Sequence, residues 1–324
     1  MITAMGLRDD VRVLVLAGGL SYEREVSLKS GRRVLDALRA TGLSADLHEA
    51  DISLLPTLQA DPPDAVVIAL HGANGEDGTL RGVLDLYDIP YVGADAQTAR
   101  RIWDKPSAKS LLREAGIRTP DWMALPHDRL SELGAAAVLD RLVDRLGLPL
   151  MIKPARGGSG FGAAVVREAA ELPAALMSCF AYDSTALVEQ FVTGANVAVS
   201  IIDLGTGPET LPIVEIVPHD GVYDYAARYT AGRTTWHVPA RLDTAMTAKV
   251  AETALAAYKT LGMRDFSRID VIVDENGEPH VIDCSVSPGL TETSLLPLAV
   301  QAAGVDLGAV MSALVERAVA RKAP

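Results

Sequence analysis

An Asn-Gly pair at 276–277 lies between two stretches of alternating polar and apolar residues, and it constrains this chain more than any other feature. Such a pair between strand-like segments predicts a β-hairpin with a two-residue loop, because Asn and Gly tolerate the positive φ that the turn requires. The two strands are predicted over 266–273 and 280–286. Counting outward from the loop places Val271 opposite Ile282.

Four polar side chains are predicted to project from one face of this hairpin. The same count places Asp270 opposite Asp283 and Arg268 opposite Ser285, since side chains on a strand alternate between its two faces. Two carboxylates about 5 Å apart repel each other by roughly 3 kcal/mol at an effective dielectric constant of about 20. A folded protein tolerates such a pair when it shares a proton or binds a cation. The hairpin therefore predicts a magnesium site made of hard oxygen donors; the alternative is a solvated hairpin whose aspartates point to water.

A glycine-rich segment, 157–162, follows a predicted strand over 150–153. Backbone N–H groups of such a loop can approach phosphate oxygens closely, and Lys153 at the end of the strand adds a positive charge. The segment lacks the GxxxxGK[ST] pattern of a Walker A loop, and the Gly-Gly pair at 18–19 lacks the GxGxxG pattern of dinucleotide-binding folds. Alone, the loop is equally compatible with a flexible hairpin turn. Together with the acidic hairpin, it predicts an ATP–Mg²⁺ site.

The order of predicted strands and helices divides the chain into three parts. In residues 1–103, apolar strands alternate with amphipathic helices, which predicts a parallel sheet with crossover helices. Residues 104–192 and 193–324 each combine predicted strands and helices, and the last part contains a long predicted loop over 218–237. The predicted fold class is therefore α/β in the first part and α+β in the other two.

Composition limits the classes of partner that this chain can have. Its net charge is −12, from 30 basic and 42 acidic residues, which argues against coating nucleic acid or an anionic membrane. Two cysteines imply no disulfide framework and suit a reducing compartment. The N-terminus lacks the pattern of a signal peptide, and no apolar run is long enough to span a membrane. We therefore expect a protein of a reducing compartment such as the cytoplasm, with no nucleic-acid or membrane partner.

Several segments in a fixed order resemble the D-alanine–D-alanine ligase family, within the ATP-grasp fold. They begin with GGLSYEREVSL, HGANGEDG and IPYVG, and the resemblance covers nearly the whole chain. The segments that carry it are 18–28, 71–78, 89–93, 104–105, 153–154, 223–229, 268–270 and 287–294. The resemblance implies a Rossmann-like N-terminal domain and two α+β domains that enclose an ATP site.

The resemblance also implies a reaction in two steps. The carboxylate of one D-alanine attacks the γ-phosphate of ATP, which gives an acyl phosphate and ADP. The amino group of a second D-alanine then displaces phosphate to form D-alanyl-D-alanine, a precursor of peptidoglycan. The implied cofactors are ATP and two Mg²⁺ ions, for which Mn²⁺ can substitute, and the implied assembly is a homodimer.

Residues on the amino-acid side of the implied site match the family by position. Glu23 would pair with the ammonium of the first D-alanine, and His71 would help to orient that substrate. Ser159 and Tyr229 would complete a hydrogen-bonded group with Glu23 that holds the loop 218–237 closed. Each also has a structural alternative: Glu23 as an acidic residue in a first helical turn, His71 as a core histidine, and Tyr229 as a packing residue.

The remaining implied roles concern the transition state, the metal and the nucleotide. Arg268 and the Gly289 N–H would stabilise the oxyanion, and Ser294 would bind the second carboxylate or simply cap a helix. The implied metal ligands are Asp270, Asp283 and Ser285. The implied ATP-binding residues are Lys105, Lys153, Gly158, Ser159, Glu189, Gln190, Val192, Asn196 and Arg228, of which Glu189, Gln190 and Val192 would hold adenine. Glu76 and Asp77 could belong to the site. Alternatively, they are acidic residues that stabilise the N-terminus of a helix beginning at Gly78.

Three positions depart from the family pattern. The usual Glu-x-Asn of the second hairpin strand reads Asp283-Cys284-Ser285, which predicts weaker Mg²⁺ binding or a water that bridges Ser285. Asn196 replaces the Glu that usually meets the ribose, and Gly160 replaces the second Ser of Gly-Ser-Ser. By the same resemblance, Tyr229 favours dipeptide over depsipeptide formation, because that position differs in the relatives that use D-lactate. Two alternatives stay open: a ligase for a different D-amino acid or a specialised-metabolite acceptor, and a weakly active nucleotide-binding paralogue.

Overall fold

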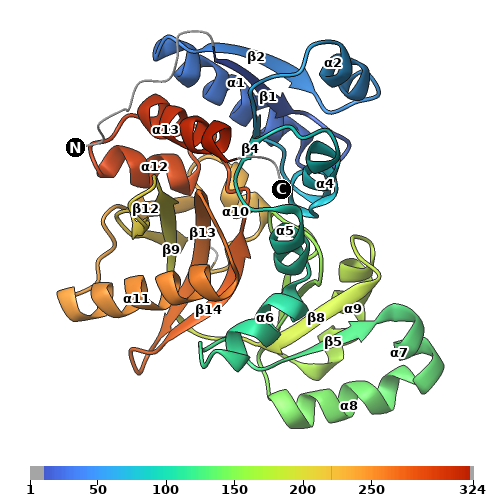
Figure 1. Ribbon diagram of the computed structural model, residues 1–324. Coiled ribbons are helices and arrows are strands. Elements are labelled where there is room, and N and C mark those ends of the chain that lie inside the picture. Colours follow the sequence, from blue (N-terminus) through green and yellow to red (C-terminus); the bar gives the residue numbers. More distant parts are fainter. Residues whose placement is uncertain (1–10, 220, 322–324) are drawn as a thin grey trace.

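The computed structural model describes residues 11–219 and 221–321, and three β-sheets form its framework (Figure 1). The first sheet is parallel, as predicted, with strand order β2-β1-β3-β4. Its central strands are apolar on both faces, because helices cover the sheet on both sides. Its strands are β1 (Arg12–Ala17), β2 (Ser44–Glu49), β3 (Ala65–Ile68) and β4 (Tyr91–Val92). The helices of this part are α1 (Arg24–Ala40), α2 (Leu54–Ala60), α3 (Ala73–Glu76), α4 (Thr79–Leu86) and α5 (Ala96–Trp103).

Helix α1 approaches β1 closely, and this fixes the loop between them. Val26, Val34 and Leu38 form its buried stripe, as the helical spacing predicts. Gly31 faces β1, and a Cβ at that position would lie 2.5 Å from the Cβ of Ala17. A small residue is therefore required there, and the close packing holds the segment before α1 in place.

The second sheet is antiparallel, with order β5-β8-β6-β7, and its helices pack around a core of leucines. It presents the end of β6 and the glycine-rich loop to the rest of the molecule. Its strands are β5 (Trp122–Pro126), β6 (Leu150–Pro154), β7 (Ala164–Val166) and β8 (Thr185–Gln190). Its helices are α7 (His127–Leu133), α8 (Ala135–Leu146), a 3₁₀ turn (Ala169–Glu171) and α9 (Leu172–Phe180). Helix α6 (Lys105–Glu114) precedes them in the chain, but its buried residues Ala108 and Leu112 belong to the core of the third sheet.

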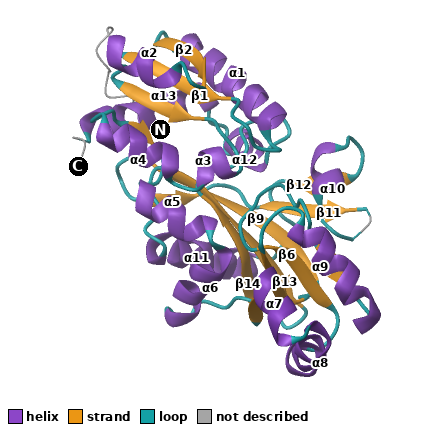
Figure 2. Cartoon of the chain, turned by 90° about the vertical axis from the view of Figure 1, so that its right-hand side faces the viewer, coloured by secondary structure: helices purple, strands orange, loops and turns teal. Residues whose placement is uncertain are grey.

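The third sheet has the order β12-β11-β9-β13-β14, with β10 paired to β9. Helix α11 covers one face, and Figure 2 shows the long strands β9, β13 and β14 of this sheet. Its strands are β9 (Gly194–Asp203), β10 (Pro208–Thr210), β11 (Val214–Pro218), β12 (Thr234–His237), β13 (Phe266–Asp274) and β14 (Pro279–Ser285). Its helices are α10 (Tyr225–Tyr229), α11 (Thr244–Thr260), α12 (Leu295–Ala302) and α13 (Leu307–Ala320).

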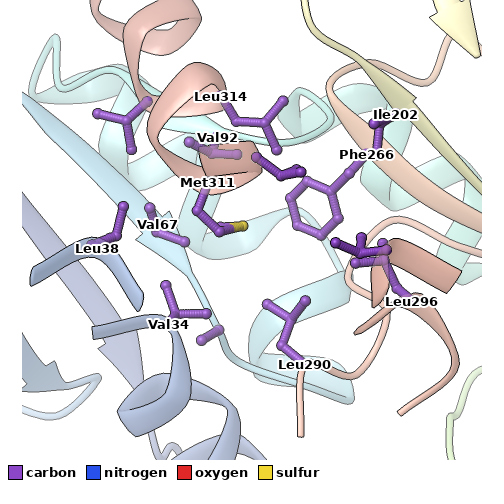
Figure 3. Packing of buried hydrophobic residues seen from close by; sticks show 14 of the residues in the cluster. Val34, Leu38, Val67, Val92, Ile202, Phe266, Leu290, Leu296, Met311 and Leu314 are labelled. Atoms are coloured by element: carbon purple, nitrogen blue, oxygen red, sulfur yellow. The ribbon is translucent and has the colours of Figure 1, made fainter. Parts of the chain in front are cut away.

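The two C-terminal helices join the first and third sheets into one core. Met311 and Leu314 of α13 lie between Val34 of α1 and Phe266 of β13 (Figure 3). Among the residues that the structure describes, no single helix is long and apolar enough to cross a membrane; α12 and α13 pass that test only as a pair, with a bend of 106° between them. The amphipathic pattern of residues 307–323 is typical of a packed terminal helix, and α13 is such a helix as far as Ala320; residues 322–323 lie outside the described part.

The loop predicted over 218–237 contains regular structure that the sequence did not indicate. Residues Tyr225–Tyr229 form α10, and Thr234–His237 form β12, which pairs with β11. Asp224 caps α10 by accepting a hydrogen bond from the N–H of Ala227 at 2.9 Å. The segment is therefore a short helix carried on a strand pair, which gives its side chains defined positions. The boundaries of the three predicted parts stay predictions, although one sheet falls within each part.

The hairpin has the predicted residue pairs at its acidic end, but its register near the turn differs from the prediction. Asp270 lies opposite Asp283 and Arg268 opposite Ser285, as predicted. The register shifts after Asp270, so Val271 faces Val281, and the prediction that Val271 faces Ile282 is wrong.

The prediction of a two-residue loop is also wrong. The N–H of Asp274 bonds the carbonyl of Glu278, which leaves three loop residues, 275–277. Gly277 has a positive φ, whereas Asn276 does not. A three-residue loop shifts the register by one, and a bulge at Ile282 shifts it back.

Candidate active site

One cavity of about 660 Å³ is lined by residues from all three parts of the chain. Every residue that the sequence assigned to the site lines this cavity, except Glu23 and Ser294. Its walls come from the glycine-rich loop, the ends of β6 and β8, the faces of β9, β13 and β14, and α10. Segments far apart in sequence therefore meet around one space that suits a small-molecule ligand.

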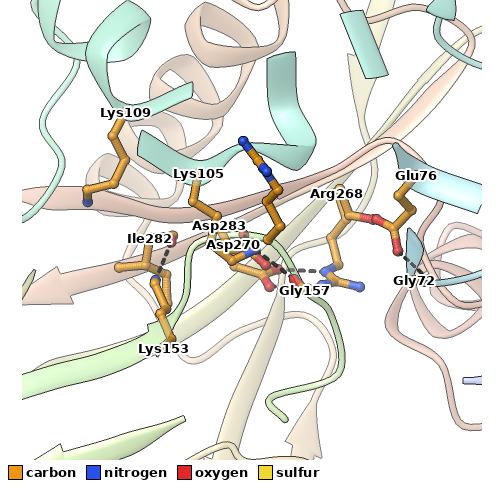
Figure 4. Close-up of polar contacts among 12 residues, drawn as sticks. Gly72, Glu76, Lys105, Lys109, Lys153, Gly157, Arg268, Asp270, Ile282 and Asp283 are labelled. Atoms are coloured by element: carbon orange, nitrogen blue, oxygen red, sulfur yellow. Dashed lines mark hydrogen bonds and ion pairs between the residues drawn. The ribbon is translucent and has the colours of Figure 1, made fainter. Parts of the chain in front are cut away.

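The two opposed aspartates each pair with a different basic residue (Figure 4). Arg268 Nε lies 2.6 Å from one carboxylate oxygen of Asp270, and Nη2 lies 2.9 Å from the other. Lys105 Nζ lies 3.0 Å from Asp283 and 2.9 Å from the carbonyl of Gly157. Burial would raise the pKa of Asp283, but the positive charges of Lys105 and Lys153 outweigh it and lower this pKa to about 2. The charge of the pair is thus balanced by the chain itself.

Glu76 joins the acidic group although the sequence suggested that it could be a helix-opening charge. Its carboxylate accepts hydrogen bonds from the Gly72 N–H at 3.0 Å and from the Ser285 hydroxyl at 3.2 Å. Burial raises the pKa of Glu76 to about 7. Asp77, by contrast, has the helix role, because it accepts hydrogen bonds from the N–H and hydroxyl of Thr79 at 2.8 Å. Of the two roles that the sequence left open for Glu76, the structure favours the one in the site, because Glu76 lines the cavity and bonds Ser285.

Glu189 lies between two lysines at the inner end of the cavity. Its carboxylate is 2.6 Å from Lys153 Nζ and 2.9 Å from Lys109 Nζ, and it is only 2 % exposed. Burial would raise the pKa of Glu189, but the two ammonium groups lower it below its usual range. Lys153 also donates to the carbonyl of Ile282, the bulged residue of the hairpin, at 2.9 Å. Lys109, which the sequence did not single out, fixes the position of Glu189.

Glu23, Ser159 and Tyr229 meet although they come from different parts of the chain. The Ser159 hydroxyl is 3.0 Å from the Tyr229 hydroxyl, and a Cβ on the preceding residue, Gly158, would lie 3.0 Å from the carboxylate of Glu23. Ser159 has a φ of 56°, a left-handed conformation that is uncommon for a residue with a Cβ. Glu23 is 4 % exposed, and burial raises its pKa. A Cβ on Gly72 would lie 2.3 Å from its carboxylate, so Gly72 leaves the space that Glu23 occupies.

His71 connects the first part of the chain to the loop after β14. Its Nδ1 is 3.1 Å from the carbonyl of Ser287, and its Nε2 is 2.8 Å from the Ser30 hydroxyl. Because a carbonyl only accepts, Nδ1 carries the proton and Nε2 accepts from Ser30. Ser30 accepts in turn from the N–H of Leu290 at 3.2 Å. Burial lowers the pKa of His71 to about 4, so the ring is neutral, and it holds the loop 287–290 in place.

Gly289 and Ser294 lie together at the start of α12. A Cβ on Gly289 would be 2.7 Å from Ser294 Oγ. Ser294 is the N-cap residue of α12 but makes no side-chain cap; its hydroxyl is 2.7 Å from that of Thr291 and accepts from the Thr291 N–H at 3.1 Å. The capping alternative for Ser294 is therefore wrong as far as its side chain is concerned.

The remaining predicted nucleotide residues lie on the wall of the cavity. Gly158 is next to Glu23. Val192 lies just after β8, and Asn196 lies on β9. The Gln190 N–H donates to the Asp121 carbonyl at 2.9 Å, so it is already engaged within the protein. Arg228 of α10 lies over the ring of Tyr223, 4.3 Å from its centre.

The acidic hairpin has the donor chemistry of a magnesium site. It offers two facing carboxylates and a nearby hydroxyl, and Mg²⁺ in proteins usually takes one or two carboxylates together with substrate phosphates. Within residues 11–219 and 221–321, no group of three or more His, Cys, Asp or Glu side chains is arranged to hold a metal. The residues present therefore fit an ion that is bound partly by the protein and partly by nucleotide phosphates. They do not form a site in which the protein supplies every ligand.

Two family models match this chain over most of its length. One is described as the D-ala D-ala ligase N-terminus and matches residues 48–94. The other is described as the D-ala D-ala ligase C-terminus and matches residues 111–316. The second match includes the glycine-rich loop, α10 and the acidic hairpin.

Individual relatives cover nearly the whole chain. The D-alanine–D-alanine ligase of Pelotomaculum thermopropionicum is 37% identical and is covered to 96%, with 95% of this chain aligned. That of Nitrosomonas europaea is 38% identical, with 96% of this chain and 98% of the relative aligned.

Among solved structures, the Bacillus anthracis D-alanine–D-alanine ligase complexed with ATP superposes with a TM-score of 0.80 at 30% identity. The alignment covers 96% of this chain and 98% of that one. The fold is thus the ATP-grasp fold that the sequence predicted. The chain belongs to the D-alanine–D-alanine ligase family.

Proposed function

We propose that this chain is an ATP-dependent ligase that joins two D-alanines into D-alanyl-D-alanine through a D-alanyl phosphate, for peptidoglycan precursor synthesis. The observation that carries the proposal is the meeting of Glu23, Ser159 and Tyr229 next to Arg268. These residues come from the three parts of the chain, so the group assembles only in the folded protein. Family membership and the match to an ATP-complexed relative support the same activity.

The first D-alanine would bind with its ammonium on Glu23. Burial favours the neutral acid at this position, so a substrate cation compensates the charge of a carboxylate that is otherwise costly to ionise. The neutral ring of His71 would orient the substrate indirectly, because both of its nitrogens are already engaged with Ser30 and Ser287. It would do so by fixing the loop that carries Gly289.

The developing oxyanion would lie near Arg268 and the Gly289 N–H. Preorganised donors in a site closed to water stabilise such charge strongly. Arg268 is held in place by its two bonds to Asp270, so its orientation does not depend on substrate. Ser294, next to Gly289, would receive the carboxylate of the second D-alanine.

ATP would lie along the cavity wall with its phosphates near Lys105, Lys153 and Arg228. Adenine would lie near Glu189, Gln190 and Val192, and the ribose near Asn196. The ligands Asp270, Asp283 and Ser285 would hold Mg²⁺, two ions by family resemblance, which supplies positive charge to the transferring phosphoryl group. We further propose a cytoplasmic location and a homodimer, both by family resemblance.

A product assay tests the proposed function. Purified protein is incubated with ATP, Mg²⁺ and a panel of D-amino acids, while ADP release and product mass are followed. We expect ADP release that requires D-alanine and a product with the mass of D-alanyl-D-alanine. ATP binding without turnover for any amino acid would contradict the proposal and favour a nucleotide-binding paralogue.

A second acceptor is the main alternative. The VanG D-Ala:D-Ser ligase of Enterococcus faecalis superposes with a TM-score of 0.79 at 28% identity, covering 94% of this chain and 98% of that one. The fold therefore accommodates at least one other named acceptor in a relative. In the same assay, ADP release that occurs only with a mixture of D-alanine and another D-amino acid would favour this alternative.

A further inference from the structure

Five aromatic rings from four segments form a continuous cluster beside the contact between Ser159 and Tyr229. The segments are the loop before α1, the glycine-rich loop, the turn after α9, and α10. The cluster consists of Tyr22, Phe161, Tyr182, Tyr225 and Tyr229. All three parts of the chain contribute at least one ring, so the cluster spans the same junction as the site.

Phe161 is the centre of this cluster, which we call the ring cluster. Its ring centre lies 4.3 Å from that of Tyr225, 5.4 Å from that of Tyr22 and 5.6 Å from that of Tyr182. The plane of the Phe161 ring is nearly parallel to the rings of Tyr225 and Tyr182. Stacking of this kind is attractive at these distances. Phe161 also lines the cavity, which Tyr22 and Tyr182 do not.

The backbone around Phe161 is shaped to bring these rings together. Gly160 and Gly162 on either side have φ angles of 76° and 65°, which residues with a Cβ rarely adopt. A Cβ on Gly160 would lie 3.0 Å from the backbone nitrogen of Tyr225, and one on Gly162 would lie 2.7 Å from the ring of Tyr182. The glycine-rich loop therefore touches α10 by its backbone as well as by the Phe161 ring.

We propose that Phe161 is a positioning residue for ligation, which fastens α10 and the Tyr22 loop to the glycine-rich loop and so keeps the site closed. This proposal rests on the proposed function. Ser159, two residues before Phe161, has a left-handed φ of 56°, so its hydroxyl meets Tyr229 only if the loop is held in this shape. A side chain that anchors the loop to α10 provides that restraint.

Closure has a chemical consequence because the first step forms an acyl phosphate. If water enters, its oxygen attacks the carbonyl carbon, the bond between that carbon and the phosphate oxygen breaks, and phosphate leaves. D-Alanine is returned, and one ATP has been converted to ADP and phosphate without a dipeptide. Excluding water from a reactive intermediate is a general result of closing an active site. The ratio of ADP released to dipeptide formed therefore reports how well α10 stays packed against the glycine-rich loop.

Three variants separate a positioning role from general packing. Phe161→Leu removes the ring, and Phe161→Tyr keeps it. Tyr22→Leu removes a ring that is 69% exposed, so that change leaves the core untouched. Phe180→Leu is the matched control, because Phe180 of α9 packs on His127 of α7 beside the core of the second sheet and lies outside the ring cluster.

We expect Phe161→Leu to raise the ratio of ADP to dipeptide at least about threefold, and Tyr22→Leu to raise it less. Phe161→Tyr and Phe180→Leu should keep the wild-type ratio. A ratio that stays at the wild-type value in Phe161→Leu would overturn the proposal. A wild-type protein that makes no D-alanyl-D-alanine would instead overturn the proposed function.

A second measurement tests the positioning role without any product. Hydrogen exchange of the backbone amides in 223–230 is followed in the full chain with ADP and Mg²⁺. Phe161→Leu should increase exchange in this segment, whereas Phe180→Leu should not. Unchanged exchange in Phe161→Leu would overturn the proposal whatever amino acids the enzyme joins.

Discussion

Lys105, at the start of α6, donates a hydrogen bond to Asp283 on β14 at 3.0 Å, across 178 residues of sequence. The same ammonium donates to the carbonyl of Gly157 at 2.9 Å, so it links the acidic hairpin to the glycine-rich loop. Asp270, opposite Asp283, is engaged separately by Arg268. A divalent ion that binds between the two carboxylates must therefore compete with positive charges of the protein.

Binding of a divalent ion is accordingly expected to depend on nucleotide. Phosphates attract Lys105, which frees Asp283, and they also complete the coordination shell of the ion. Mn²⁺ titration followed by electron paramagnetic resonance should show at least about tenfold tighter binding with ADP than without it. Equal affinity in the two titrations would contradict a site shared between the hairpin and the nucleotide.

Replacing Asp270 by Asn is expected to reduce turnover by about 100-fold or more, since a metal ion at a phosphoryl group contributes several kcal/mol. The same change leaves buried Arg268 without a carboxylate, which should cost about 3 kcal/mol of unfolding free energy. Steady-state ADP release and denaturant unfolding measure the two effects. Glu275→Gln is the control, because it removes one negative charge from the exposed loop of the same hairpin. Full activity in Asp270→Asn would refute the assignment of this residue as a ligand.

Replacing Glu189 by Gln is expected to destabilise the protein by about 3 kcal/mol or more, because two buried ammonium groups lose their shared carboxylate. Unfolding in urea, followed by tryptophan fluorescence, gives this free energy. Asp144→Asn breaks the exposed pair with Arg141 and should change stability by less than about 1 kcal/mol. If both variants lose the same small amount, the Lys109–Glu189–Lys153 group does not act as a buried ion pair.

The acidic hairpin shows how far local sequence signals reach. The Asn-Gly signal placed the turn and led to the observed pairing of Asp270 with Asp283, yet two of its details were wrong. Asp274 accepts hydrogen bonds from the N–H groups of Asn276 and Glu278, at 2.9 and 2.8 Å, and this stabilises a three-residue loop. The bulge at Ile282 then restores the register. Its carbonyl accepts from Lys153, a partner that no local pattern reveals.

Glu76 and the ring cluster show what local patterns leave out. Glu76 precedes a helix, where an acidic residue is favourable in any case, so its sequence position was equally compatible with two roles. Its partner Ser285 is 209 residues away, and only the folded chain brings them together. Phe161 lies between glycines in a segment whose composition indicates a loop, but the rings that it contacts come from three other segments. Long-range packing determined both roles.

Stability is expected to fall between pH 6.5 and pH 4 because of His71. In the unfolded chain this imidazole binds a proton near pH 6.5, whereas in the folded protein its pKa is lowered to about 4 by burial. Between these values the unfolded state carries one more proton, so the free energy of unfolding rises with pH and falls as the solution is acidified. The whole window corresponds to about 3 kcal/mol. Urea unfolding at several pH values, in the wild type and in His71→Gln, isolates this component, because all other titrating groups are common to both. The two stability curves should converge as the pH falls from 6.5 to 4, and curves that stay parallel over that range would mean that His71 is protonated equally easily in the folded and unfolded chain.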